Sequence, residues 1–440
     1  MLAAVEPSSL QTGIMSILKN RNFVLHWICV AVAATGGFLS AIALPWLVLS
    51  ISKNNPLMMS GIIALSGLPY AIFILFGGAL TDRFSPLRLL FITRSCFALL
   101  MLTLAVLVYH QITPYWMLAI FALLLGLLNA FGVPASESLL PSILPANILG
   151  QGNGIIMVTM QVSQVLGPML AGWILWLGRT LHGIPLDQVD YSSLAGAFGL
   201  NALTTIIVLA VMSQIRPLPA ATAEASKNLF KLIFEGMQFC WNDRGIRTVL
   251  AYLCLISFFV QGPLAAILPV LTKVKLGLSE AEYGNLYGML GMGTILGAGL
   301  AMLTKPNPRI LGRWILCCDA CSGLAMVLLG YSHHIYLSCG LLLLIGTMNG
   351  FIAINGITWF QQRTPDHYMG RIMSILMFAI LGLVPVSATL TGYLIHTHSL
   401  ELIISTAGGI IIFCAGGGLL IPPIRRMGQQ TPLRQVRQAA

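Results

Sequence analysis

The sequence predicts an all-α membrane protein whose twelve transmembrane helices form two six-helix bundles. Of its 440 residues, 57% are hydrophobic and 8% are charged, whereas soluble domains carry about 25% charged residues. Apolar stretches long enough to cross a bilayer recur twelve times, and one polar interval divides them six and six. Lipid is therefore the expected solvent, and a water-soluble globule is excluded.

The apolar stretches have the length that a membrane requires. A helix needs about 20 apolar residues to cross a hydrocarbon core. Such stretches occupy residues 24–51, 57–80, 89–109, 115–134, 153–177, 193–213, 247–271, 283–304, 314–332, 335–358, 372–394 and 401–422. The first is too long for the core of a cleavable signal peptide and lacks a cleavage pattern, so we expect it to be retained as a span.

The polar interval at 214–246 sets the domain organisation. We expect an N-terminal bundle at 1–213, a cytoplasmic linker at 214–246, a C-terminal bundle at 247–422 and a basic cytoplasmic tail at 423–440. Aromatic and aliphatic residues are mixed with two lysines from Lys227 to Glu235, which predicts an amphipathic helix on the membrane surface. The halves echo each other weakly, because Pro145 to Met157 resembles Pro365 to Met377.

The basic residues predict which side of the membrane holds the termini. An even number of spans puts both termini on one side. If that side is the cytoplasm, only Lys53, Arg179, Lys273 and Lys275 of the 23 lysines and arginines lie outside. Cytoplasmic loops are enriched in Lys and Arg, so both termini are expected there. This bias also explains the net charge of +10, and nucleic acid is not an expected partner.

No catalytic, cofactor or metal site is expected. The nine cysteines lie mostly inside apolar runs, where they act as small packing residues. Cys317, Cys318 and Cys321 share one apolar span without a nearby pair of histidines, which argues against zinc. No Walker A sequence is present, so ATP is not the energy source. A membrane-embedded enzyme or a non-transporting sensor is a remote alternative.

A charged motif stands between the second and third spans. Residues 78–83 (GALTDR) resemble the G-x-L-x-D-R-x-G-R-R signature of the major facilitator superfamily, in the loop where that family carries it. Ser85 and Pro86 replace the second Gly and the following Arg of the signature. The resemblance implies transport by alternating access of two bundles. It implies a gating loop formed by Gly78, Asp82, Arg83 and Arg88, with Glu137 either as a partner of the arginines or as a solvated helix end.

Other short motifs resemble the branch of that superfamily that holds macrolide-type drug exporters and siderophore exporters. They are residues 20–23, 43–45, 134–141, 166–172, 235–236 and 364–365, together with Gly370 and Arg371 in the second-half loop. The resemblance covers nearly the whole chain. It departs from many drug-exporting members in the first span, where residues 34–38 (ATGGF) contain no acid.

The fifth span carries Gly167, Pro168 and Gly172, which resemble the fifth-span motif of antiporters in this superfamily. Proline removes one backbone hydrogen bond and glycine thins a helix, so the helix can bend and pack closely. The alternative is generic helix packing.

Three ionisable residues are candidates for a role inside or at the edge of the membrane. A charge at the bilayer centre costs about 2.5–3.5 kcal/mol, so such residues are functional candidates. Arg94 and Asp319 occupy matching positions in the third and ninth spans. The resemblance makes these spans outer supporting helices, which favours structural ion pairing over substrate contact. His26 opens the first span and is either an interfacial residue or a proton carrier.

Uncharged polar and aromatic residues are the candidates for a substrate cavity. By resemblance, spans one, four, seven and ten line a central cavity, and spans five and eight add further residues. The candidates are Thr35, Trp46, Asn129, Gln161, Gln164, Gln261, Tyr287, Asn349, Asn355 and Trp359. Such a lining suits an amphipathic or aromatic solute better than a small ion. For each residue, a hydrogen bond between helices is the alternative role.

The sequence therefore predicts a monomeric exporter in the bacterial inner membrane, coupled to protons, for a small amphipathic molecule such as a drug-like compound or a siderophore. The alternative within transporters is an importer or facilitator of a metabolite or metal chelate, because alternating access is reversible.

Overall fold

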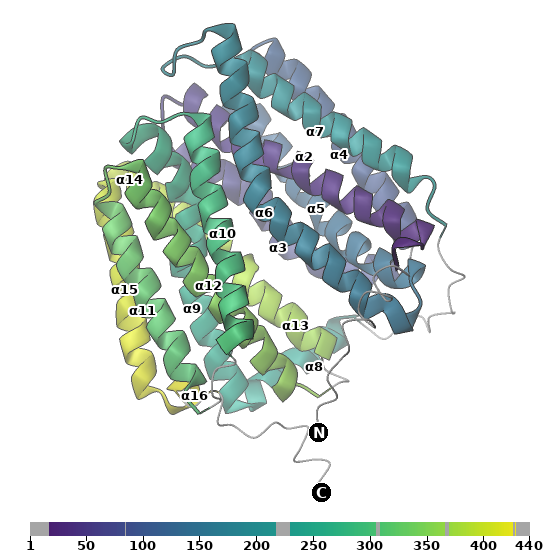
Figure 1. Ribbon diagram of the computed structural model, residues 1–440, viewed down its shortest axis with the longest axis vertical. Coiled ribbons are helices and arrows are strands. Elements are labelled where there is room, and N and C mark those ends of the chain that lie inside the picture. Colours follow the sequence, from purple (N-terminus) through teal and green to yellow (C-terminus); the bar gives the residue numbers. More distant parts are fainter. Residues whose placement is uncertain are drawn as a thin grey trace, which may run out of the picture. The chain divides into compact units, whose positions relative to one another are not determined.

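The computed structural model describes residues 17–83, 85–216, 229–304, 309–365, 369–425 and 427. All regular structure in these ranges is helical (Figure 1). Twelve of the helices are long and apolar enough to cross a membrane. The all-α class and the number of spans that the sequence predicts are therefore confirmed.

The chain divides into two compact units, and the division falls inside two helices. One unit comprises Met1–Leu44 and Ile72–Ala225, and the other comprises Pro45–Ala71 and Ser226–Ala440. The boundaries lie beside Pro45 of α2 (Arg21–Ile51) and close to Pro69 of α3 (Pro56–Arg83). The turn that joins these two helices therefore packs with the helices of the second unit. In this turn Lys53 and Asn54 adopt the left-handed conformation, with φ of 54° and 62°.

The first unit contains the remaining parts of α2 and α3 together with α4 (Pro86–Tyr109), α5 (Tyr115–Ile143), α6 (Ala146–His182) and α7 (Tyr191–Met212). α4 packs against both α5 and α7. Asn20 caps α2 by accepting a hydrogen bond from the Phe23 N–H at 3.1 Å. The Asn22 amide donates to the Arg216 carbonyl at 2.7 Å. These contacts fasten the start of α2 to the end of α7.

The second unit contains more helices than the first, because a π-helical turn divides one of its spans and two shorter helices precede and follow its spans. Its helices are α8 (Leu229–Asn242), α9 (Arg244–Val270), α10 (Glu280–Thr304), α11 (Leu311–Gly330), α12 (Ile335–Arg363), α13 (Met369–Met377), α14 (Val384–Thr397), α15 (Leu400–Leu420) and α16 (Pro422–Arg425). The turn η1 (Leu271–Lys275) follows α9, and η3 (Phe378–Gly382) joins α13 to α14. α8 lies in the predicted linker and continues past Glu235.

Prolines and serines explain the interruption at η3. A π-helical turn pairs each carbonyl with the N–H five residues later, but the residue five positions after Ile380 is Pro385, which has no N–H. The Ser257 hydroxyl of α9 donates to the Ile380 carbonyl instead. In return the Ser387 hydroxyl of α14 donates to the Phe258 carbonyl. The break in the eleventh span is thus held against α9 by side chains.

Glycines let α10 and α12 pack with their backbones in contact. A Cβ atom added at Gly293 would overlap the Leu343 carbonyl, and one added at Gly346 would overlap the Leu290 carbonyl. Without a hydrophobic drive between helices in lipid, small residues at such interfaces permit the close van der Waals packing that holds helices together. The pair α10 and α12 therefore forms a tightly packed element of the second unit.

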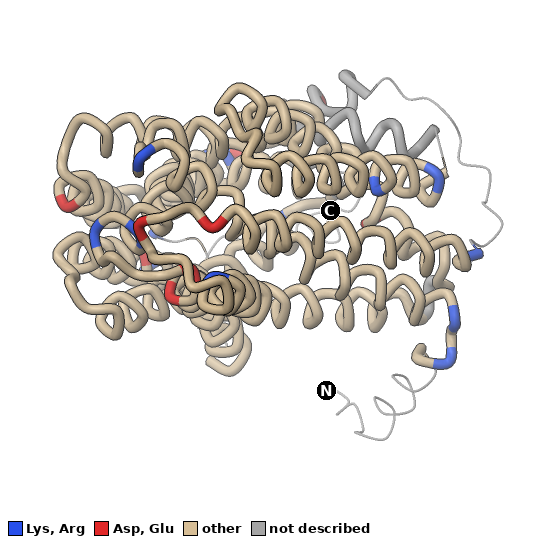
Figure 2. Tube along the Cα trace, turned by 90° about the horizontal axis from the view of Figure 1, so that it is seen from above, with Lys and Arg blue, Asp and Glu red and all other residues tan. Residues whose placement is uncertain are grey.

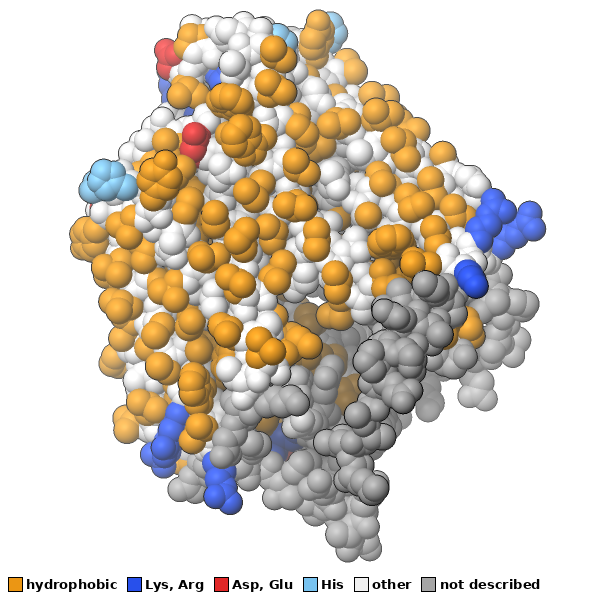
Figure 3. Space-filling model, in the orientation of Figure 1, with side chains coloured by type: hydrophobic (Ala, Val, Ile, Leu, Met, Phe, Trp, Pro, Cys, Tyr) orange, Lys and Arg blue, Asp and Glu red, His pale blue; other side chains and the backbone are white. Residues whose placement is uncertain are grey.

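Charged residues are sparse along the middles of the helices. Figure 2 shows Lys, Arg, Asp and Glu mainly near helix ends, and Figure 3 shows hydrophobic side chains spread widely over the visible face. Exposed side chains along α4 and α6, such as Leu99, Leu102, Met157 and Leu170, are apolar. Exposed apolar surface of this extent, on helices long enough to cross a bilayer, is the surface of a membrane-spanning protein.

Candidate functional site

Two predicted cavity residues, Trp46 and Tyr287, lie in one aromatic cluster of the second unit. Trp46, near the end of α2, is buried and stacks on Tyr283 of α10 with ring centroids 6.0 Å apart. Tyr283 meets Tyr287 edge-on at 6.5 Å. The Lys273 ammonium of η1 lies 4.8 Å from the centroid of the Trp46 ring and donates a hydrogen bond to the Ser50 hydroxyl. From the sequence, Lys273 is expected only as a charge on the outer side of the membrane.

This cluster combines three aromatic rings with the Lys273 cation. A cation over a ring contributes from about 0.5–1 kcal/mol at exposed sites to about 2 kcal/mol when desolvated, and Lys273 is half-buried. Among the described residues, the buried indole N–H of Trp46 has no hydrogen-bond partner. Leaving a buried donor unsatisfied costs about 1–3 kcal/mol. The Lys273 contact therefore stabilises the cluster, and the Trp46 indole N–H is left without an acceptor among the described residues.

A second basic residue of η1 joins the helix ends beside this cluster. The Lys275 ammonium lies 3.0 Å from a carboxylate oxygen of Glu401 at the start of α15. It also donates to the Gly330 carbonyl at the end of α11. An open cleft of about 540 Å³ lies here, with Asn54, Lys275, His396 and Glu401 among its lining residues. This is the end of the helices that the charge pattern assigns to the outside.

Asp319 lies in the interior of α11, two turns into the ninth span. It is 1% exposed, and the Tyr252 hydroxyl of α9 donates to its Oδ2 at 2.7 Å. Its Oδ1 has no hydrogen-bond partner among the described residues. No cation of the described ranges lies within ion-pairing distance, so the expected structural ion partner is not found there. Tyr252 was not among the candidates from the sequence.

The other predicted ionisable residues are dispersed in the first unit. Arg94 of α4 is half-buried, and its guanidinium carbon lies 6.0 Å from the centroid of the Phe97 ring. His26 of α2 is buried at 3% exposure. Glu137 of α5 and Arg88 of α4 are exposed, and no ion pair between them is found in the described ranges.

Most of the predicted gating residues lie where the structure describes only the backbone. Gly78, Asp82 and Arg83 belong to the last turns of α3, and Gly370 and Arg371 belong to the first turn of α13. The side chains at these positions lie outside the described part of the structure. The gating loop therefore stays a prediction.

The fifth-span motif is a site of close helix packing. Gly167, Pro168 and Gly172 are buried in the 37-residue helix α6. A Cβ atom added at Gly167 would overlap the Phe38 ring of α2. The glycine therefore allows α6 to approach α2 within the first unit, as expected of a thinned helix.

The remaining cavity candidates differ in exposure. Thr35, Asn129, Gln164 and Gln261 are exposed, whereas Gln161, Asn349 and Asn355 are half-buried. The Thr35 hydroxyl donates to the Ala31 carbonyl at 3.0 Å, and the Asn355 amide donates to the Phe351 carbonyl at 2.9 Å. These two side chains thus bond to their own helices.

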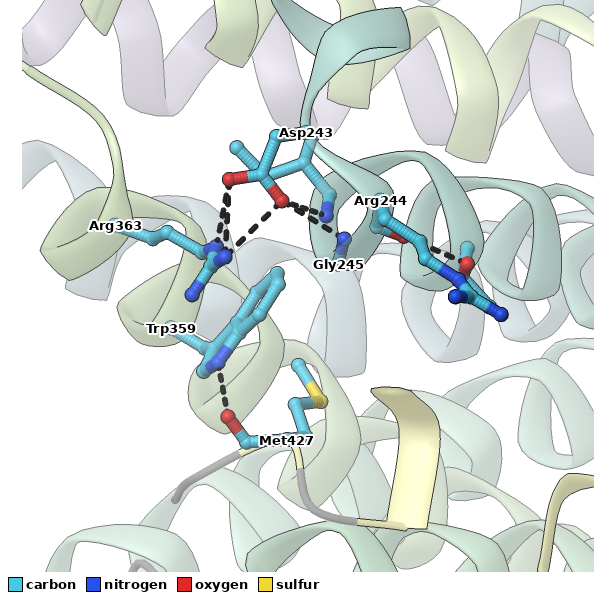
Figure 4. A network of polar contacts seen from close by, with 8 residues as sticks. Asp243, Arg244, Gly245, Trp359, Arg363 and Met427 are labelled. Atoms are coloured by element: carbon cyan, nitrogen blue, oxygen red, sulfur yellow. Dashed lines mark hydrogen bonds and ion pairs between the residues drawn. The ribbon is translucent and has the colours of Figure 1, made fainter. Parts of the chain in front are cut away.

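A polar network in the second unit joins α9 to the end of α12 (Figure 4). Asp243 caps α9, because its Oδ1 accepts hydrogen bonds from the Gly245 and Ile246 N–H groups at 2.8 and 2.9 Å. Its carboxylate also accepts bonds from the Arg363 guanidinium at 2.9 to 3.2 Å. The side chains of Arg363 and Asp243 in this ion pair are 15% and 14% exposed. The Asp before a helix start is a cap signal in the sequence, but nothing local indicates its pairing with Arg363.

Trp359 belongs to this network and not to the aromatic cluster around Trp46. The Arg363 guanidinium carbon lies 5.6 Å from the centroid of the Trp359 ring. The Trp359 indole donates a hydrogen bond to the Met427 carbonyl (Figure 4). Met427, which lies beyond the end of α16, is thereby tied to α12.

Metal ligation has no candidate among the described residues. No three His, Cys, Asp or Glu side chains in these ranges are placed to hold one ion. The nine cysteines are free thiols.

The chain is similar to one protein family and to several transport proteins. A family model described as Major Facilitator Superfamily matches residues 27–389. The multidrug efflux pump Tap of Mycolicibacterium fortuitum is 26% identical over 396 residues, which cover 88% of this chain and 92% of that protein. The staphyloferrin A transporter of Staphylococcus aureus is 24% identical over 81% and 85% of the two chains. The enterobactin exporter EntS of Shigella boydii is 24% identical over 70% of each.

Solved structures share the fold at lower identity. The nucleoside transporter NupG superposes with a TM-score of 0.69 at 11% identity, over 93% of this chain and 100% of that one. A D-xylose-proton symporter superposes with a TM-score of 0.68 at 13% identity, over 93% and 99%. These likenesses establish the twelve-helix fold, in agreement with the sequence-based expectation.

Proposed function

This chain belongs to the major facilitator superfamily, a family of transporters, and on that premise we propose that it exports a small amphipathic molecule by alternating access. The substrate class is a drug-like compound or a siderophore. The proposal rests on relatives named as a multidrug efflux pump and as an enterobactin exporter, which align with 88% and 70% of the chain.

The side chains of the second unit support an amphipathic substrate. The cluster contains two buried rings, Trp46 and Tyr283, and a half-buried ring, Tyr287, and Lys273 adds a half-buried cation. Pockets lined by aromatic residues with a few convergent polar groups favour organic ligands that carry hydrogen-bonding groups. Siderophores and many drugs are organic molecules that carry such hydrogen-bonding groups.

We propose that the protein works as a monomer in the bacterial inner membrane, with both termini in the cytoplasm. Export is driven by proton antiport, and the Asp82 loop is the cytoplasmic latch. Charge and helix-dipole contacts at the end of α3 are the physical basis of the latch. Substituting Asp82→Asn should reduce transport several-fold without lowering the yield of folded protein; unchanged transport would remove the latch role.

The direct test is accumulation in a strain from which the coding gene has been deleted. Ethidium serves as the drug-like probe and enterobactin as the siderophore probe. We expect the deletion strain to retain more of one probe than the complemented strain, and an uncoupler to abolish the difference. Lower accumulation in the deletion strain would instead identify an importer, and no difference for either probe would contradict the proposed substrate class.

A further inference from the structure

The carboxyl group of Asp319 is buried inside one of the spanning helices. It is 1% exposed in the middle of α11 and has one hydrogen bond, from the Tyr252 hydroxyl at 2.7 Å. Ser322, three residues later on the same helix face, is fully buried. Its hydroxyl, like Asp319 Oδ1, has no partner among the described residues. Two unsatisfied polar groups therefore lie one helical turn apart.

The groups that face Asp319 are neutral. Tyr252 approaches from α9 and Cys414 from α15, and Cys317, Cys318 and Cys321 neighbour it on α11. The helices α12 and α16 also pack against α11, but no charged residue of their described parts acts on this carboxyl group. The basic residues of α11 and α16 lie at helix ends, where Arg313 is exposed.

Burial without a cation decides which protonation state is compatible with this environment. A buried carboxylate without a counter-ion pays several kcal/mol in lost hydration, and one tyrosine hydroxyl replaces only part of that hydration. A carboxylic acid with its proton on Oδ1 is neutral and keeps the Tyr252 bond to Oδ2. The enclosed geometry is therefore that of the protonated acid, and a carboxylate requires water to reach the site.

We propose that Asp319 is the proton-binding site of this transporter, with Tyr252 as a positioning residue that holds its Oδ2. The proton comes from water, binds to Oδ1 when the site is enclosed, and returns to water when the site opens; no other bond changes. The inference deepens the proposed proton-coupled export and rests on it. It also supplies an ionisable group to a chain that has no acid in the stretch Ala34–Phe38.

The site is tested without transport by infrared titration of the purified full-length protein. We expect wild type to show the carbonyl band of a protonated carboxylic acid that disappears at alkaline pH, and Asp319→Asn to lack it. Tyr252→Phe should keep the band at a shifted frequency, because the hydrogen bond to Oδ2 is lost. Asp190→Asn replaces another buried aspartate, the N-cap of α7, and should leave the band unchanged. A titrating band that persists in Asp319→Asn would overturn the assignment.

Transport in proteoliposomes separates the site from the proposed function. With ethidium as the probe, Asp319→Asn should lose accumulation driven by a proton gradient at least tenfold while it retains ethidium counterflow, which needs no net proton movement. Accumulation retained in Asp319→Asn would overturn the coupling role. If wild type moves no ethidium with or without a gradient, export of this drug-like probe fails, and the infrared titration still decides whether Asp319 binds the proton.

Discussion

At the scale of single residues, Asp243 has two roles that only the folded chain reveals. Its Oδ1 caps α9, and the same carboxylate receives the Arg363 guanidinium from the end of α12. The cap is predictable because Asp243 directly precedes Arg244 and a helical apolar pattern. The ion pair is not, because Arg363 is distant in the sequence and its register is set by how α9 and α12 pack.

This double role predicts unequal losses of stability. Arg363→Gln removes the ion pair and should lower the free energy of unfolding by about 1–3 kcal/mol, as for a lost hydrogen bond to a charged group. Asp243→Ala removes the cap as well and should cost about 1 kcal/mol more. Thermal unfolding of the detergent-solubilised protein measures both. Glu401→Gln, which breaks a more exposed pair, is the control with a change below about 1 kcal/mol; equal stability of wild type and Arg363→Gln would contradict the role of the pair.

At the scale of elements, hydropathy located every span but not its ends or interruptions. The fifth apolar stretch predicts a helix over 153–177, whereas α6 runs from Ala146 to His182. Polar residues such as Gln151 and Arg179 continue the helix beyond the apolar stretch, so hydropathy cannot report them. The hydropathy of the eleventh stretch does not indicate η3. This π-helical turn depends on Pro385 and on a hydrogen bond from Ser257, which lies on another helix.

The close approach of α10 and α12 predicts how substitutions at two glycines of α12 will differ. Gly346→Ala should destabilise the protein by about 1–3 kcal/mol, because the added methyl group overlaps the Leu290 carbonyl and forces the helices apart. Gly340→Ala is the matched control, since a Cβ atom there meets nothing within 4 Å. It should be neutral or stabilise the helix by up to about 1 kcal/mol. Similar unfolding temperatures for the two variants would contradict the packing argument.

At the scale of the whole molecule, the number of spans and the family could be predicted because both depend on local patterns. Apolar length fixes each span, and the motif at residues 78–83 is contiguous. The packing of Pro45–Ala71 with the second unit could not be predicted. It depends on contacts such as those of Lys273 with Trp46 and Ser50. These residues are distant in the sequence, where Lys273 is expected only as an outside charge and Trp46 only as a cavity residue.

The charge bias predicts one orientation of the chain in the membrane. Alkaline phosphatase inserted in the turn at Lys53 and Asn54 should be active, because this enzyme matures only outside the cytoplasm. The same enzyme fused after Ala440 should be inactive, and a green fluorescent reporter at that position should fluoresce. The reversed pattern would contradict the orientation that the positive-inside rule gives.

The bond between the Trp359 indole and the Met427 carbonyl has a practical consequence for anyone who expresses this protein. Met427 is buried in the same core cluster as Trp359 and Phe360. A stop codon or an affinity tag placed directly after α16 would delete the acceptor and strand an indole N–H in apolar surroundings, at about 1–3 kcal/mol. Purification handles and protease sites therefore belong downstream of residue 427.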